Sequence, residues 1–122
     1  MKASRLWLVA LTFAHGLLNV ARAAEPDTWA VIGQQGLVRA VLVPTSQATD
    51  EAAYDRQIAR LCEPERTCFL NFYTNTSAAP LTMPLPDAIA NEATASYRFS
   101  AKNGVRAMTW SCRLKIAGKE CF

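Results

Sequence analysis

The sequence predicts a small α+β domain, in which a three- or four-stranded sheet carries two packed helices and is stapled by disulfides. Three observations predict this class. Runs rich in β-branched and aromatic residues alternate with segments of helical periodicity. All four cysteines follow an N-terminal stretch with the pattern of an export signal. Residues 24–122 are enough for one domain with a modest core.

Residues 1–23 have the three-part pattern of a secretory signal peptide. Lys2 and Arg5 precede a mostly apolar run over residues 6–20. Residues 21–23 then read Ala-Arg-Ala, with small side chains at the two positions that a signal peptidase recognises. The apolar run is shorter than the roughly 20 residues that span a bilayer. We therefore expect cleavage after residue 23, no stable membrane anchor afterwards, and a periplasmic or secreted mature protein.

The mature chain is expected to carry no net charge. The full sequence has 13 Lys and Arg residues, 10 Asp and Glu residues and a formal net charge of +3. Lys2, Arg5 and Arg22 lie in the predicted signal, which holds no acidic residue, so 10 basic residues remain against 10 acidic ones. Without an excess of positive charge the mature protein has no electrostatic reason to bind nucleic acid.

The four cysteines indicate disulfides rather than a metal site, because an even number in an exported small domain is typical of paired thiols. Cys62 and Cys68 flank a turn that contains Pro64, whereas Cys112 and Cys121 flank a short polar segment. This spacing favours the pairs 62–68 and 112–121. A pair between Cys68 and Cys112, joining two neighbouring strands, stays open as the alternative.

The first half of the mature chain predicts a hairpin followed by a helix. Residues 29–32 and 37–43 are apolar and β-branched, and the glycines between them suit a turn or a bulge within a single strand. Asp50 can cap a helix whose apolar residues recur at helical spacing. Pro64 requires that helix to end near Cys62.

Residues 68–74 form the most strand-like run of the chain, and its alternation separates two sets of side chains. Both sets include aromatic rings, so we expect a central strand. One face would carry Cys68, Leu70 and Phe72, and the other Phe69, Asn71 and Tyr73.

The last third of the chain predicts one more helix and one more strand. Residues 87–95 favour a helix, with Pro86 suited to its first turn. Residues 97–99 fit either its continuation or an extended segment, and the two alternatives stay open. Residues 108–116 alternate between apolar and polar side chains, which predicts a strand with one buried face.

Catalytic patterns are weak in this sequence. The one histidine, His15, lies in the predicted signal, so a serine or cysteine nucleophile in the mature chain lacks its usual base. Ser100 and Lys102 are two residues apart at a turn, which is poor geometry for a catalytic pair. The cysteine spacing is wider than the redox Cys-x-x-Cys pattern. We predict no catalytic residues, no metal site and no cofactor.

Binding features are stronger. Phe69, Tyr73 and Trp110 provide rings of the kind that protein interfaces favour. The alternative is that these rings fill the small core. Asn71 shares the predicted face of Phe69 and Tyr73, and a polar group beside two rings needs a partner, in the protein or outside it. We therefore predict a binding site made of Phe69, Asn71, Tyr73 and Trp110.

Three segments of the chain are similar in sequence to other proteins: Cys62 to Asn75, Pro84-Leu-Pro-Asp87 and Trp110-Ser-Cys112. They resemble a set of small exported proteobacterial proteins to which no function has been assigned. The resemblance implies a periplasmic or secreted protein with paired cysteines, and it implies no activity.

Together these features predict a small exported protein that acts as a non-catalytic binding or inhibitor-type domain. Its expected partner is another periplasmic protein or a small ligand. The alternative is a small hydrolase-like enzyme that uses carboxylates such as Asp87 and Glu92. The two hypotheses differ in whether those carboxylates converge in a pocket.

Overall fold

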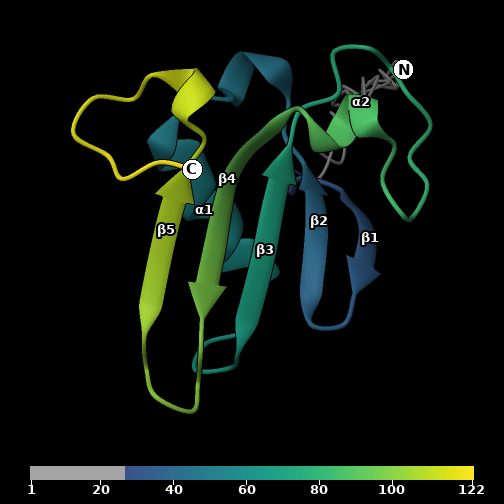
Figure 1. Ribbon diagram of the computed structural model, residues 1–122. Coiled ribbons are helices and arrows are strands. Elements are labelled where there is room, and N and C mark those ends of the chain that lie inside the picture. Colours follow the sequence, from purple (N-terminus) through teal and green to yellow (C-terminus); the bar gives the residue numbers. More distant parts are fainter. Residues whose placement is uncertain (1–26) are drawn as a thin grey trace, which may run out of the picture.

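The structure, a computed structural model, describes residues 27–122 and builds them around a five-stranded sheet (Figure 1). The strands lie in sequence order across the sheet. β2 and β3 are parallel and are joined through helix α1 (Glu51–Leu61), whereas all other neighbouring strands are antiparallel. The strands are β1 (Val31–Gln35), β2 (Val38–Leu42), β3 (Cys68–Tyr73), β4 (Ala93–Phe99) and β5 (Arg106–Trp110).

The predicted α+β class is confirmed, but the sheet has five strands instead of three or four. Residues 31–42 form a true hairpin with a turn at Gly36, whose φ of +57° suits glycine, and its register shifts between Val31 and Gly33. β3 lies at the centre, with β2 on one side and β4 on the other. Its expected place as a central strand is therefore confirmed.

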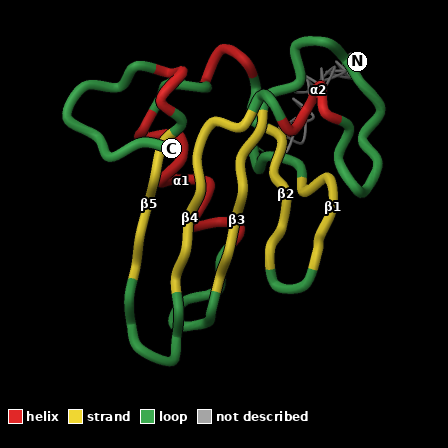
Figure 2. Tube along the Cα trace, viewed as in Figure 1, coloured by secondary structure: helices red, strands yellow, loops and turns green. Residues whose placement is uncertain are grey.

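Helix α1 covers one face of the sheet (Figure 2). Asp50 caps its N-terminus, because Asp50 Oδ1 accepts a hydrogen bond of 3.1 Å from Ala53 N. Its fully buried Tyr54 packs edge-on against Phe72 of β3 and Trp110 of β5, with ring centroids 5.0 and 4.7 Å apart. The core thus lies between α1 and one side of the sheet.

The second predicted helix is much shorter than expected. Helix α2 (Asp87–Ala90) buries Ile89 completely and then ends, and residues 93–99 form β4. The prediction of a helix over residues 87–95 was therefore wrong beyond residue 90. β4 pairs with strands on both sides, and these two ladders outweigh the modest helix propensity of its alanines. Residues 97–99 are strand.

The last predicted strand also ends early. β5 stops at Trp110, and Cys112–Leu114 is a 3-10 turn followed by Lys115 at a φ of 54°. The chain then folds back, so that Glu120 O accepts from Trp110 N at 3.3 Å and Phe122 N donates to Trp110 O at 2.9 Å. The alternation over residues 108–116 therefore does not belong to one strand.

Both expected disulfides are present, Cys62–Cys68 and Cys112–Cys121. The first ties the end of α1 to the start of β3, and the second ties the folded-back C-terminal segment to the end of β5. The predicted signal, residues 1–23, lies outside the described residues. Within residues 27–122 no helix is long and apolar enough to cross a membrane.

Candidate functional site

Within residues 27–122 no long helix covers the face of the sheet opposite α1, and the predicted side chains of β3 lie on this face. Phe69, Asn71 and Tyr73 alternate with the buried Cys68, Leu70 and Phe72 and are each half-buried. The expected division of this strand into two faces is therefore confirmed. We call the side of Phe69, Asn71 and Tyr73 the outer face.

One part of the outer face is closed by the loop that precedes α2. Met83 of this loop lies directly over Gly33 of β1, where an added Cβ would collide with the methionine side chain. Ala40, which pairs with Gly33, is buried. Among the described residues the outer face is therefore left uncovered mainly over β3, β4 and β5.

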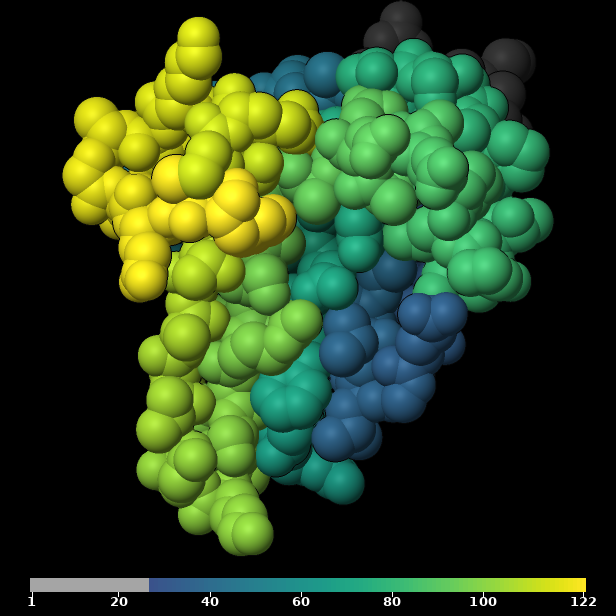
Figure 3. Space-filling model, in the orientation of Figure 1, coloured from purple at the N-terminus to yellow at the C-terminus, as the bar shows by residue number. Residues whose placement is uncertain are grey.

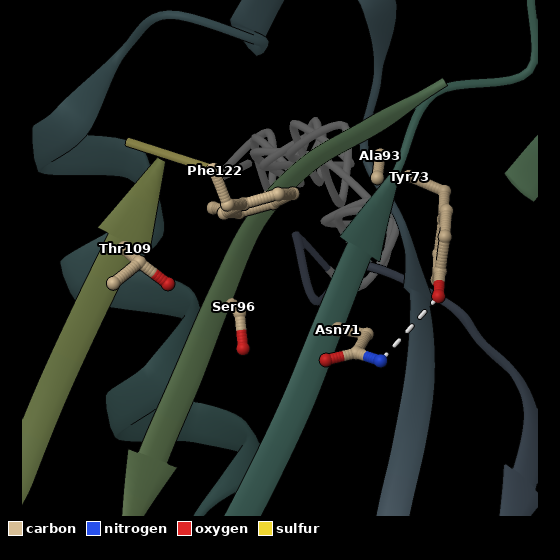
Figure 4. A pocket seen from close by; sticks show the side chains of 7 residues that line it. Asn71, Tyr73, Ala93, Ser96, Thr109 and Phe122 are labelled. Carbon is tan, nitrogen blue, oxygen red and sulfur yellow. Dashed lines mark hydrogen bonds between the residues drawn. The ribbon is translucent and has the colours of Figure 1, made fainter. Parts of the chain in front are cut away.

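A hollow of about 320 Å³ lies on this open part, between the C-terminal segment and residues 76–92 (Figure 3). Tyr73 and Phe122 stand over it; Asn71 and Ser96 lie below and between these two rings, and Thr109 lies on the far side of Phe122 from Tyr73 (Figure 4). The β3–β4–β5 register places Asn71, Ser96 and Thr109 in one row across three strands. The full lining is Asn71, Tyr73, Ala93, Ala95, Ser96, Thr109 and Phe122.

Arg98 of β4 holds Asn71 from the neighbouring strand. Its Nη2 donates to Asn71 Oδ1 at 2.8 Å, and its Nη1 donates to the carbonyl oxygens of Leu70 at 3.1 Å and Tyr97 at 2.9 Å. The guanidinium also lies 5.5 Å from the centre of the Phe69 ring, within range of a cation–π contact. Phe69 thus supports the arginine beside the hollow and does not itself line it.

Trp110 is the one predicted binding residue that the structure separates from the others. It pairs with Ala95, and both residues lie on the α1 side of the sheet. Trp110 is only 5% exposed, and its ring packs against that of Tyr54. It therefore belongs to the core. Ser96, Thr109 and Phe122 were missed because they join the site through strand register and the folded-back C-terminal segment, which local periodicity does not report.

The carboxylates of the enzyme hypothesis do not line the hollow. Glu92 accepts hydrogen bonds from Thr74 Oγ1 at 2.9 Å and from Thr76 N at 3.0 Å. Burial raises the pKa of Glu92, but the hydrogen bonds from Thr76 and Thr74 and the charge of Arg113 outweigh it, so the pKa lies below 4.5. Glu92 thus ties the loop after β3 to the start of β4, while Asp87 lies exposed in the first turn of α2.

The side chains that line the hollow offer rings, hydroxyls and an amide, and none is a carboxylate, an amine or an imidazole. Within residues 27–122 no three His, Cys, Asp or Glu side chains are grouped so that they could hold a metal ion. The arrangement can bind a ligand through ring contacts and hydrogen bonds. No protein-family model, curated protein or solved structure matches the chain.

Proposed function

We propose that this protein is an exported, non-catalytic binding domain that takes a small ligand in the hollow on its outer face. The observation that carries the proposal is the position of two rings, Tyr73 and Phe122, over a row of polar side chains on three neighbouring strands. Binding sites for small molecules combine apolar walls with a few placed polar groups, and this hollow is at the lower end of their usual size, about 300–1,000 Å³.

The fixed position of both walls supports the proposal. Tyr73 lies at the end of the central strand, which is paired on both sides. Phe122 follows Cys121, which is joined by a disulfide to Cys112, and Cys112 N donates to Phe122 O at 2.9 Å. Walls that are held before the ligand arrives lower the entropy that binding costs.

The proposed compartment is the periplasm or the outside of the cell. Two disulfides in a small domain fit an oxidising compartment. The export proposal is tested by mass spectrometry of the protein recovered from a periplasmic fraction, which should show an N-terminus at Ala24. A chain that still begins at Met1 and sediments with membranes would contradict it.

The binding proposal is tested by native mass spectrometry. The oxidised protein is incubated with the low-molecular-weight fraction of a periplasmic extract, and any added mass is compared among three forms: the parent, Tyr73→Ala, and Val105→Ala as a control. Val105 is 58% exposed and lies outside the lining of the hollow. We expect the parent and the control to retain the same small ligand and Tyr73→Ala to lose it. No added mass, or the same added mass on all three forms, would contradict the proposal.

A further inference from the structure

The orientation of the Asn71 amide is determined by Arg98. A guanidinium has donors and no acceptor, so only the oxygen of the amide can face it. Asn71 Oδ1 therefore points to Arg98, at 2.8 Å, and Nδ2 points to the other side, where it lies 3.4 Å from the Tyr73 hydroxyl (Figure 4). The oxygen of this side chain is thus held by Arg98, and its donor group is directed at the Tyr73 hydroxyl, which lines the hollow.

The remaining polar groups of the hollow are donors or can become donors. Asn71 Nδ2 carries two hydrogens, and the long contact with Tyr73 uses at most one of them. The Tyr73 hydroxyl accepts from Asn71 in that contact, which leaves its own proton free to donate. Within residues 27–122 no hydrogen bond engages the hydroxyls of Ser96 and Thr109, and each can turn its proton toward a ligand. The hollow therefore matches a ligand that presents acceptors.

The charge beside the hollow favours an acceptor that is negative. The ion pairs of the described residues are Arg66 with Glu63 and Lys119 with Glu51, so Arg98 has no carboxylate partner among them. Its guanidinium lies directly behind Asn71 and polarises the amide, which makes Nδ2 a better donor. Hydrogen bonds to an ionised acceptor are about twice as strong as those between neutral groups.

From these contacts we propose that the hollow binds a small organic carboxylate. The carboxylate accepts hydrogen bonds from Asn71 Nδ2 and the Tyr73 hydroxyl, and the apolar body of the ligand lies between the rings of Tyr73 and Phe122. Arg98 is a positioning residue that acts through Asn71. This inference rests on the proposed binding function and adds the chemical class of the ligand.

Three probes with the same ring and different head groups test the ligand class: phenylacetate, phenylacetamide and phenethylamine. Binding is followed by NMR titration of the isotopically labelled, oxidised protein, using the backbone amides of Asn71, Tyr73, Ser96 and Thr109. We expect saturable shifts with phenylacetate and about tenfold weaker binding of phenylacetamide, as the loss of a charge-assisted hydrogen bond predicts. Phenethylamine should give no saturable shift. Binding of phenethylamine as tight as that of phenylacetate, or no saturable shift with phenylacetate, would overturn the inference.

The variant Asn71→Asp exchanges the donor for an acceptor without changing the size of the side chain. Its carboxylate still accepts from Arg98, so the contact between β3 and β4 is kept. We expect phenylacetate to bind at least about tenfold more weakly and phenethylamine to become the preferred probe. Asn103→Asp is the matched control, because Asn103 Oδ1 accepts from Val105 N at 2.9 Å in a distant turn. An unchanged preference in Asn71→Asp would contradict the role of the amide.

The role of Arg98 is tested by Arg98→Met, which removes the charge and lets the Asn71 amide turn over. If Arg98 positions the amide, the preference for phenylacetate over phenethylamine should fall by about tenfold. A merely structural role would instead weaken every probe by a similar factor and overturn the positioning role.

The ligand class and the binding function fail in different ways. Equal binding of all three probes at the hollow would refute the carboxylate and leave the binding site intact. A ligand retained in native mass spectrometry together with no phenylacetate shift would likewise refute only the class. If neither experiment finds a bound molecule, both proposals fall.

Discussion

The hydroxyl groups of Tyr54 and Thr94 lie 2.8 Å apart in a buried hydrogen bond that joins α1 to the strand β4, 40 residues away. The Tyr54 hydroxyl donates its single proton to Ala48 O at 2.7 Å and therefore accepts the proton of Thr94. Burial raises the pKa of Tyr54 to about 12, and the hydrogen bond with Thr94 and the charge of Arg113 offset part of the rise. The neutral phenol is thus a fixed part of the core.

Stability should fall at alkaline pH through Tyr54. Because its folded pKa of about 12 lies above the ordinary value of 10.0, its contribution is complete below pH 10.0 and is lost as the pH rises toward 12. We expect Tyr54→Phe to lose about 1–3 kcal/mol near neutral pH, since the Thr94 hydroxyl loses its partner. This deficit should shrink above about pH 10. Urea denaturation of the parent and the variant at several pH values measures this difference in the free energy of unfolding. A difference independent of pH would contradict the burial of the phenol.

Glu92 should contribute to stability in the acid range. Its folded pKa is lowered, so its contribution is present above the unfolded value near 4.5 and disappears as the pH falls through the folded pKa. We expect Glu92→Gln to be less stable at neutral pH, by about 1 kcal/mol or less because the site is close to solvent. At the lowest pH the two proteins should agree. Glu120→Gln serves as a control in the same thermal melts, and a Glu92→Gln deficit that persists at low pH would speak against the carboxylate contacts.

The two disulfides should have different effects on the hollow. Each closes a short loop, and the loss of each should cost about 2–3 kcal/mol in the chain-entropy description. Only the double variant Cys112→Ala/Cys121→Ala releases the segment that carries Phe122, so it should also weaken phenylacetate binding. Cys62→Ala/Cys68→Ala is the matched control and should keep the affinity. Equal affinities in both double variants would show that Phe122 is not a wall of the site.

The two faces of β3 should respond differently to truncation. Phe72 is fully buried against Tyr54, and Phe72→Ala should cost about 3–5 kcal/mol. Tyr73 is half-buried on the outer face, so Tyr73→Ala should cost about 1 kcal/mol or less and remove ligand binding. Thermal denaturation and the probe titration separate these effects. A large loss of stability in Tyr73→Ala with unchanged binding would make Tyr73 a core residue.

Much of the fold and a smaller part of the site follow from local sequence. The period of two in β3 determines which side chains share a face, so Asn71 and Tyr73 could be placed together without the structure. Pro64 and Asp50 similarly mark the ends of α1. Cysteine spacing alone indicated the pairing, because both loops are short.

The rest depends on contacts between distant segments. β4 is a strand because two neighbours pair with it, although its alanines favour a helix. The position of Trp110 in the core depends on the register between β4 and β5, and that of Phe122 depends on the reversal of the chain after Lys115. Neither register nor reversal has a local pattern, so Ser96, Thr109 and Phe122 could not be found.

The return of the chain to β5 also affects how the protein behaves at high concentration. β5 is an edge strand, and exposed edges can pair with other copies and start aggregation. The main-chain N–H and C=O of Trp110 form hydrogen bonds with Glu120 and Phe122, so this end of the edge is not free to pair. The other end of the strand carries the charged side chain of Arg106. Reduction of Cys112–Cys121 would free this edge, so we expect loss of the disulfide to reduce solubility as well as binding, which light scattering after reduction would register.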